Sequence, residues 1–455
     1  MSNTTVSAPS TSQSSARQAA SPDASRPRDL RHLYGALAGS TFEVFDWSIY
    51  STFAAFFAAS FFAADGVSAF LGANIVFAVG FIARPVGSLL FGHLSDTRGR
   101  KVSLFATSAA ALLGTVLIAL APTQETIGVA AAIILVSARI IQGLAHGGEQ
   151  PAAGAYVSEM AKPHNRGLWS SWIYVAILLG GLLGSLLGAI LTSTLGTDVL
   201  TAGGWRIAFG VGALGSAYAL WLVWHLPETE VFEGAQHRAR PQIAREMARA
   251  WRPALLIIGL TLGVTVAFQN WAAMTGYHIA VFEAQPANVL WASVGANVVA
   301  IISLPLWGAL SDRIGRKPVV IVGLAGVAVS TFGLMLFLDG SASRMFIAQT
   351  ISLVLLAAPL SIMPALMAEL VPTSIRTIGV GFSYAIATAI FGGTVSALQT
   401  WIGSTWGPQY FGIYVTIAVA ISIVVAFLIP ETRGKDLREA DPAPVTRNDI
   451  EEVNA

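Results

Sequence analysis

The sequence predicts an all-α protein that crosses a membrane many times, and three observations support this. The 455-residue chain is 54% hydrophobic and only 11% charged, whereas soluble domains carry about 25% charged residues. Its mean hydropathy is +0.65. Apolar runs of roughly twenty residues recur along the chain, and each is long enough to cross a hydrocarbon core of ~30 Å as a helix rising ~1.5 Å per residue.

Twelve such runs are predicted as transmembrane helices, separated by short polar turns. The tenth run contains Pro359 and Pro364, but breaks of this kind are tolerated where neighbouring helices surround them. A longer hydrophilic stretch divides the runs into two sets of six. The approximate spans are 33–62, 69–92, 102–121, 127–148, 168–192, 205–226, 253–276, 287–310, 318–338, 345–367, 377–402 and 408–430.

The first thirty residues are rich in Ser, Ala and Pro and lack an apolar core, so they are interpreted as a disordered tail rather than a cleaved signal peptide. The predicted parts are a cytoplasmic tail over 1–31, a six-helix half over 32–226, a cytoplasmic linker over 227–252, a second half over 253–432 and a cytoplasmic tail over 433–455.

Composition also excludes several classes of function. The net charge of +1 gives no electrostatic reason to expect nucleic acid, and the absence of cysteine excludes disulfides and thiolate metal sites. No phosphate-binding Gly-x-x-x-x-Gly-Lys-Ser/Thr loop is present, so ATP could drive this chain only through another subunit. We expect no enzyme, no metal site and no cofactor.

Lys and Arg set the predicted orientation, because they concentrate on the cytoplasmic side of membrane proteins. With the N-terminus inside, the opposite side keeps only Arg206 and Arg344, and both termini are cytoplasmic. The segments then predicted to be cytoplasmic hold Arg98, Arg100, Lys101, Lys162, Arg166, Arg238, Arg240, Arg245, Arg249, Arg252, Arg313, Arg316, Lys317 and Arg376.

The two halves repeat one another. Gly92–Lys101 (GHLSDTRGRK) recurs 216 residues later as Gly308–Lys317 (GALSDRIGRK). Parallel repeats of this kind suit alternating-access transporters, whose binding site lies near the midplane between the halves. Two further matches follow in the same order: Glu159 and Arg166 with Glu369 and Arg376, and Pro227–Thr229 with Pro430–Thr432.

The repeated loop resembles the best-known signature of the major facilitator superfamily. More narrowly, the chain is similar to the metabolite:proton symporters of bacterial inner membranes, over roughly residues 31 to 433. The resemblance implies the twelve-helix major facilitator fold and a substrate among organic acids, proline and betaines. Gln269 departs from the aromatic residue expected on the seventh helix. Four stretches carry the closer match: Glu43–Asp46, Arg84–His93, Arg139–Glu149 and Glu369–Thr394.

Glu43 and Asp46 lie near the middle of the first predicted span and, at spacing i, i+3, on one face of it. Each buried charge costs ~2.5–3.5 kcal/mol on insertion scales, so each should face a cavity and a partner. Two neighbouring carboxylates in low dielectric are not easily both ionised, so one of them can carry a proton near neutral pH. We expect proton coupling here; the alternative is a buried anchor for an arginine.

Arg139, Gln142, His146 and Glu149 form one stripe of the fourth span. A guanidinium fits a carboxylate through two parallel hydrogen bonds. Arg139 is therefore expected either to bind an anionic substrate, with Gln142, or to pair with Glu43 or Asp46. Arg84 is a second such arginine, for substrate or scaffold. His146 is expected to be a satisfied polar residue rather than a proton relay.

On the seventh span, Gln269 and Asn270 provide neutral hydrogen-bonding groups, and Trp271 and Tyr277 are predicted as walls of the binding site. Gln349 on the tenth span is a weaker candidate.

The repeated loops are expected to hold the halves together on the cytoplasmic side and to break on opening, as the resemblance implies. An Asp there can accept hydrogen bonds from helix N-termini and pair with Arg. The predicted gating residues are Asp96, Arg100, Asp312, Arg316, Glu149, Glu159, Arg166, Glu369 and Arg376.

Taken together, the sequence predicts a monomeric inner-membrane transporter that takes up a small organic acid, such as a di- or tricarboxylate, with protons by alternating access. Two alternatives stay open. One is proton symport of a zwitterion such as proline or betaine, against which the absence of a clear aromatic cage argues. The other is a transporter-like receptor that binds solute without moving it.

Overall fold

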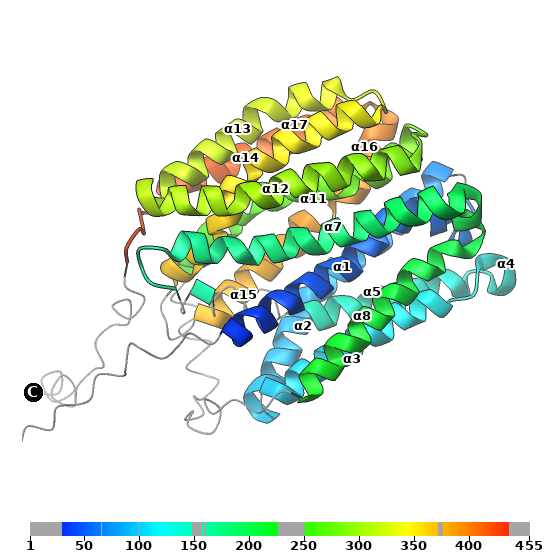
Figure 1. The fold of residues 1–455 in the computed structure, drawn as a ribbon, viewed down its shortest axis with the longest axis horizontal. Helices are drawn as coiled ribbons and strands as arrows, with labels where there is room; N and C mark the ends of the chain where they lie inside the picture. The colour runs from blue at the N-terminus through cyan, green and yellow to red at the C-terminus, as the bar shows by residue number, and fades with distance from the viewer. Residues whose placement is uncertain are drawn as a thin grey trace, which may run out of the picture.

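The structure is a computed structural model that describes residues 30–64, 66–98, 100–147, 157–158, 161–225, 251–371 and 376–435. The elements in these ranges are helices, most of them long rods lying side by side in a bundle (Figure 1). Most of the predicted linker and nearly all of both predicted tails fall outside the described residues.

Each of the six spans predicted in the first half coincides with a long helix. A short helix, α4, precedes the fourth, and the π-helical segment η1 joins the fifth to the sixth. The elements are α1 (Leu30–Phe61), α2 (Gly66–Arg98), α3 (Arg100–Leu120), α4 (Gln124–Ile127), α5 (Ala130–His146), α7 (Arg166–Val199), η1 (Leu200–Gly204) and α8 (Trp205–His225).

The second half repeats this arrangement. Its fifth predicted span is built from two α-helices joined by the π-helical segment η3, whereas α14 runs unbroken through Pro359 and Pro364. The elements are α11 (Trp251–Val281), α12 (Pro286–Ile314), α13 (Arg316–Phe337), α14 (Ala342–Leu370), α15 (Arg376–Ala387), η3 (Thr388–Gly392), α16 (Val395–Thr405) and α17 (Pro408–Leu428).

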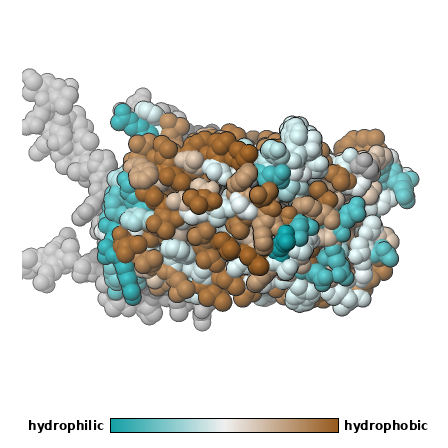
Figure 2. All heavy atoms as spheres, turned by 90° about the horizontal axis from the view of Figure 1, so that it is seen from above, coloured by the Kyte–Doolittle hydropathy of each residue, from teal (hydrophilic) through white to brown (hydrophobic). Residues whose placement is uncertain are grey.

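Within the described residues, nine stretches are long and apolar enough to cross a membrane, and the stretch Arg166–Trp224 among them contains both α7 and α8. Helix α5 is a shorter apolar helix, and α1 is not among the nine. A count of twelve crossings therefore stays a prediction. Figure 2 shows a largely hydrophobic flank between more hydrophilic ends, as expected for a surface that faces lipid.

Helices α7 and α12 lie side by side and join the two halves (Figure 1). Their backbones approach closely where two glycines meet. A Cβ atom built on Gly167 would lie 2.7 Å from the carbonyl oxygen of Gly308, and one on Gly308 would lie equally close to that of Gly167. At the other end of the same pair, Trp291 donates a hydrogen bond to Ser193 at 3.4 Å.

The bundle has two distinguishable ends. We call the end where α2 finishes at Arg98 and where α7 and α13 start at Arg166 and Arg316 the basic end, and the other the opposite end. Contacts between the halves occur at both. At the opposite end, Asn74 of α2 donates a hydrogen bond to Thr400 of α16 at 3.1 Å.

Candidate functional site

A cavity lies between the two halves. Helices α1, α2 and α7 supply one side of its lining, and α11, α12, α14 and α15 supply the other. Among the described residues, its charged lining side chains are Glu43 and Arg84. Neutral hydrogen-bonding side chains, including Gln269, Asn297 and Gln349, come from the second half. The cavity therefore combines one carboxylate, one guanidinium and uncharged polar groups.

Trp47 of α1 contacts two arginines. The guanidinium of Arg84 lies 4.2 Å from the centre of the Trp47 ring and 4.0 Å from that of Phe81. The guanidinium of Arg139 lies 3.9 Å from Trp47 and 4.3 Å from Tyr50. Cation–π contacts stabilise a cation by ~2 kcal/mol or more when water is excluded. Helices α2 and α5 thus bring their arginines to the same aromatic ring.

Asp46 is held by α3 and α5. Thr115 donates a hydrogen bond to its Oδ1 at 2.6 Å, and the Gln142 amide donates to its Oδ2 at 2.7 Å. Gln142 in turn accepts a hydrogen bond from Arg139 at 2.8 Å. Arg139 is therefore connected to Asp46 through Gln142. Neither Arg139 nor Gln142 is among the residues that line the cavity.

Glu43 has different neighbours, although it lies three residues from Asp46. It lines the cavity, and its Oε1 lies 3.7 Å from Nδ1 of His146. Arg84 is within electrostatic range of Glu43 and of the Tyr384 hydroxyl. The hydroxyl of Tyr384 lies close to that of Tyr174, across the two halves. The spacing of i, i+3 therefore does not bring both carboxylates into one cavity.

His146 corrects one expectation from the sequence. The ring is 6% exposed, and neither of its nitrogens has a hydrogen-bond partner among the described protein atoms. It packs against the edge of Trp47, with ring centres 5.7 Å apart. Among the described residues His146 is therefore buried without a hydrogen bond, and its Nδ1 lies 3.7 Å from Oε1 of Glu43, beyond normal hydrogen-bond distance.

The four residues predicted on α11 divide into two pairs. Gln269 and Trp271 line the cavity. Asn270 accepts a hydrogen bond from Gln399 at 2.9 Å, and Tyr277 is buried away from the cavity against Phe282. Consecutive residues of a helix point about 100° apart, so neighbours on α11 meet different helices.

Several residues at the site received no role in the sequence analysis, and Thr115, Tyr174 and Tyr384 are among them. Thr115 bonds to Asp46, and the two tyrosines line the cavity. Their one sequence signal is that each carries a hydroxyl inside an apolar run, a property shared by many residues that merely bond to their own helix backbone.

At the basic end, a buried ion pair connects the halves. Nη1 of Arg166 on α7 donates to Oε1 of Glu369 on α14 at 2.8 Å, and the Glu369 side chain is fully buried. Thr432 donates to the other carboxylate oxygen at 2.5 Å. Nε of Arg316 lies 3.8 Å from that same oxygen. Glu369 is therefore the centre of a network drawn from both halves.

Asp312 makes a second connection between the halves. Its carboxylate accepts hydrogen bonds from the backbone N–H groups of Gly167 and Leu168, both at 2.9 Å, at the start of α7. It also accepts one from Arg316 at 2.7 Å. The expectation that this Asp accepts hydrogen bonds from a helix N-terminus is confirmed. The favourable interaction of a carboxylate with the helix dipole explains the contact.

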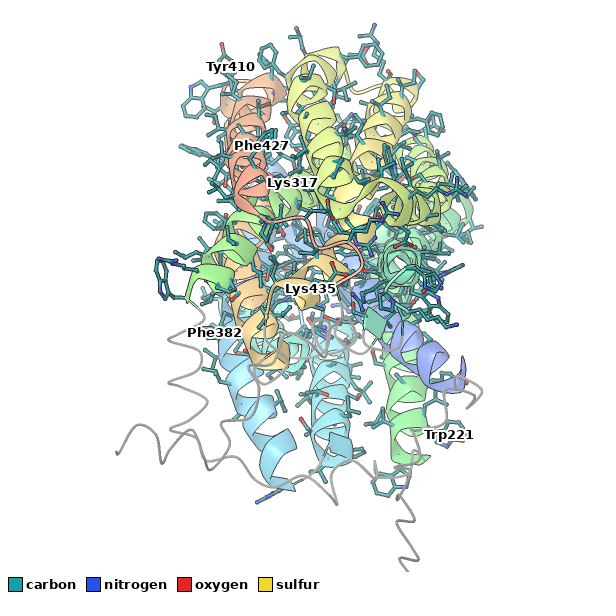
Figure 3. The ribbon with its side chains drawn as sticks, turned by 90° about the vertical axis from the view of Figure 1, so that its left-hand side faces the viewer. Trp221, Lys317, Phe382, Tyr410, Phe427 and Lys435 are labelled. Carbon is teal, nitrogen blue, oxygen red and sulfur yellow. The ribbon has the colours of Figure 1, made fainter. Side chains whose placement is uncertain are left out.

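The segment after α17 passes over this network. Lys435 donates a hydrogen bond to the backbone oxygen of Glu369 at 2.8 Å, and its own backbone oxygen accepts one from Arg166 at 3.0 Å. Figure 3, which views the basic end, places Lys435 near its centre and Lys317 beside α17. The C-terminal segment thus contacts both members of the ion pair.

Glu431 caps the start of α13. It accepts hydrogen bonds from the backbone N–H groups of Arg316 and Lys317 at 2.9 and 3.0 Å. Burial alone would raise the pKa of this carboxyl, but these two donors and the N–H groups of Thr432 and Arg433 outweigh it and hold the pKa below its ordinary value. An ionised Glu431 therefore anchors the C-terminal segment to α13.

Five predicted gating residues are not placed by these contacts. Glu149 and Glu159 lie outside the described residues, and the described side chains do not include those of Asp96, Arg100 and Arg376.

Comparison with known proteins adds three kinds of similarity. The family model for "Sugar (and other) transporter" matches residues 33–256 and 244–443. The alpha-ketoglutarate permease of Escherichia coli K12 is 31% identical over 90% of this chain and 96% of its own. The citrate-proton symporter of Salmonella typhi is 32% identical over 83% of this chain and 88% of its own.

A further relative is the ectoine/proline transporter ProP of Corynebacterium glutamicum, which is 30% identical over 94% of this chain and 89% of its own. Among solved structures, the partially occluded inward open conformation of the xylose transporter XylE from E. coli aligns with a TM-score of 0.69 at 20% identity, over 89% of this chain and 98% of that one. This last match shows the fold.

The similar proteins are transporters, not enzymes, and the apolar helices identify a multi-pass membrane protein. The chain belongs to the sugar (and other) transporter family, within the major facilitator superfamily.

Proposed function

We propose that this protein is a proton-coupled symporter that takes up a small organic anion by alternating access. Two relatives support the substrate class by name, a permease for alpha-ketoglutarate and a proton symporter for citrate. The cavity supports it through its chemistry, because Arg84 offers a guanidinium to a carboxylate and Gln269 and Gln349 offer neutral hydrogen bonds to the rest of the molecule.

The observation that carries the proposal is the contact of Trp47 with both arginines, at 4.2 and 3.9 Å. An aromatic cage for a quaternary ammonium needs ring faces free of other cations. At Trp47 two guanidinium groups already use the ring, and a third cation there would meet electrostatic repulsion. An anion entering the same region would be attracted instead.

A second candidate substrate class is a zwitterion such as proline or a betaine. One relative is named as an ectoine/proline transporter. The cavity is also lined by Phe268, Trp271 and Tyr384. Among the described residues, no guanidinium lies over the rings of these three residues, in contrast to Trp47 and Phe81. This aromatic wall weakens the argument from a missing cage, and makes zwitterions the control compounds of choice.

We place the basic end in the cytoplasm, since Lys and Arg concentrate there. Both termini then lie on the cytoplasmic side of a bacterial inner membrane, and the two halves move as separate units. We further propose that the protein works as a monomer with the proton as its coupling ion and with no cofactor.

The test uses purified protein in liposomes that contain a pH-sensitive dye. Mono-, di- and tricarboxylates, proline and betaine are added outside one at a time. We expect acidification of the lumen with one or more of the acids and none with the zwitterions. Acidification by betaine or proline alone would establish the second candidate. Exchange of a labelled acid without any acidification would contradict proton coupling.

A further inference from the structure

Gln349 of α14 carries an amide whose two ends have different surroundings. Its nitrogen donates hydrogen bonds to the backbone oxygen of Trp271 at 3.4 Å and to Oγ of Ser293 at 3.3 Å. Its oxygen, Oε1, is buried and has no hydrogen-bond partner among the described protein atoms. A carbonyl oxygen can only accept, so the contact with Trp271 requires the amide nitrogen on that side. Oε1 is therefore the unused acceptor of this amide.

Ser293 of α12 provides the complementary donor. Its Oγ accepts hydrogen bonds from Gln349 and, at 3.4 Å, from the Asn297 amide, whose nitrogen also donates to the Ser293 backbone oxygen at 2.8 Å. A hydroxyl has two lone pairs and one O–H group. Both lone pairs of Ser293 are used, and the described residues provide no acceptor for its O–H. An unused donor thus lies beside the unused acceptor.

These side chains belong to the cavity wall that the second half supplies. Ser293, Asn297 and Gln349 all line the cavity, and they are between 2% and 8% exposed. Buried acceptors are almost always satisfied, and each exception calls for an explanation. In a transporter the molecule that enters this cavity is the substrate. A group of the substrate that both donates and accepts would satisfy Gln349 and Ser293 together.

We propose that Gln349 and Ser293 form a subsite for a hydroxyl group of the substrate, so that the transported anion is a hydroxycarboxylic acid. The inference rests on the proposed uptake of an organic anion. The substrate hydroxyl donates its hydrogen to Oε1 of Gln349 and accepts one from Ser293. A carboxylate of the same molecule meets the guanidinium of Arg84, which lines the cavity from the first half. One anion then contacts both halves.

Other polar groups fit this subsite less well. An oxo group or a second carboxylate only accepts hydrogen bonds, so it would match the Ser293 O–H but be repelled by Oε1 of Gln349. An ammonium group only donates and would leave the Ser293 O–H without an acceptor. Its charge would also lack a counterion, because the second half contributes no charged side chain to the described lining of the cavity. A hydroxyl donates and accepts without carrying charge.

The experiment measures, by isothermal titration of purified protein, the binding of acids that differ only at the hydroxyl. The pairs are malate with succinate, 2-hydroxyglutarate with glutarate, and citrate with propane-1,2,3-tricarboxylate. The oxo acid is 2-oxoglutarate, and proline and betaine are the zwitterions. Wild-type protein is compared with Gln349→Met, which removes the amide, and with Ser293→Ala. The matched control is Gln399→Met, because Gln399 is equally buried and its Oε1 is also unpaired among the described atoms, but it is not among the lining residues.

We expect the hydroxy acid of at least one pair to bind wild-type protein about tenfold tighter or more than its partner, because a site built for a hydroxyl rejects the analogue that lacks it. This ratio should fall to about twofold or less in Gln349→Met and in Ser293→Ala, and it should not change in Gln399→Met. Each ratio is taken within one protein, so a general loss of affinity cancels. Ser293→Ala gives the same readout if the larger substitution prevents folding.

Equal affinity for both members of every pair would refute the subsite and leave the proposed anion transport intact. A hydroxyl preference that persists in both Gln349→Met and Ser293→Ala, or that is lost equally in Gln399→Met, would also overturn it. So would tighter binding of 2-oxoglutarate than of 2-hydroxyglutarate. Binding of proline or betaine with no acid bound would instead refute the proposed substrate class, and the hydroxyl subsite with it.

Discussion

At Asp46, the carboxylate oxygens accept hydrogen bonds from Thr115 and Gln142, and Gln142 holds Arg139. Glu43 instead faces the cavity and His146. The two acids that the sequence groups into one proton-coupling pair therefore have different surroundings. The surroundings of Asp46 favour the role of a buried anchor for an arginine, which the sequence analysis gave as the alternative to proton coupling. Those of Glu43 favour the role of proton carrier.

We predict different losses for the two neutral substitutions. Glu43→Gln should abolish proton-driven accumulation and keep counterflow exchange, because the amide cannot carry a proton but leaves Arg139 anchored. Asp46→Asn should lose both activities, because Gln142 loses the carboxylate that fixes its amide and no longer holds its oxygen toward Arg139. Breaking one member of a buried charge network typically costs ~3–5 kcal/mol. Uptake and exchange measured side by side in liposomes distinguish these results; equal behaviour of both variants would contradict the division.

The sequence could identify Glu43, Asp46, Arg84 and Arg139, because a charge inside a twenty-residue apolar run needs a functional or structural partner. It could not identify which partner each one has. Spacing on a helix gives the direction of a side chain, but the neighbours of that side chain come from helices tens of residues away, such as Thr115 on α3 for Asp46. The roles therefore required the packing of α1 against α3 and α5.

At the scale of elements, the connections of α7 and α14 show a similar limit. Glu159 with Arg166 and Glu369 with Arg376 have the same spacing in the two halves, so the repeat predicts paired roles without naming the partners. The structure pairs Arg166 with Glu369 of the other half. The helices themselves were predictable, because length and apolarity determine a span without reference to its neighbours. Eleven of the twelve predicted spans coincide with one long helix each, and span 377–402 coincides with α15, η3 and α16.

We predict that Glu369→Gln opens the basic end. The substitution leaves Arg166 and Arg316 without their buried counterion, a loss of ~3–5 kcal/mol in typical buried pairs. The chain has no cysteine, so Ala365→Cys, at a buried position on α14 whose N–H contacts Ser170 of α7, provides a single reactive thiol. An impermeant maleimide added from the basic side should label this thiol about tenfold faster or more in the Glu369→Gln background.

The matched control for that experiment is Asp339→Asn, which removes an exposed pair with Arg344 at 3.2 Å. Exposed ion pairs contribute little to stability because water screens them, so labelling at position 365 should not change. An increase in both backgrounds would mean that the probe reports general loosening rather than the gate.

Glu431 gives a prediction about pH. Its pKa is held below the ordinary value of 4.5 in the folded protein, so its contribution to stability is complete above the unfolded pKa and declines as pH falls through the lower folded pKa. Glu431→Gln should therefore lower the apparent melting temperature at pH 7, by roughly 2 °C, with the difference from wild type shrinking as pH falls below about 4. Glu125→Gln, at an exposed site on α4, should show no such difference. A constant gap at all pH values would exclude the ionised cap.

At the scale of the whole molecule, the halves contact each other at both ends. Arg166 meets Glu369 at the basic end, and Asn74 meets Thr400 at the opposite end. Alternating access requires that these two sets of contacts do not break together, since the cavity between them would then be open to both sides. The sequence repeat predicted two equivalent halves, but only the packed structure shows where their contacts concentrate.

Two glycines allow each end to be opened separately. A Cβ atom on Gly276 of α11 would lie 3.0 Å from the Phe70 ring and 3.2 Å from the backbone oxygen of Ser51, both in the first half. Gly308 makes the equivalent approach to Gly167 near the basic end. We predict that Gly276→Trp forces the opposite end apart and that Gly308→Leu forces the basic end apart, since bulky side chains cannot fit either contact.

Single cysteines at positions 74 and 365 report the two ends in the otherwise cysteine-free chain. Gly276→Trp should speed labelling at position 74 and slow it at 365, and Gly308→Leu should do the reverse. Gly333→Leu, where a Cβ atom would meet nothing within 4 Å, should change neither. If the halves rock as rigid units about the cavity, opening one end closes the other, and the two rates move in opposite directions. If either substitution speeds labelling at both positions, the two ends open independently. A coupled transporter with such ends would leak substrate and protons.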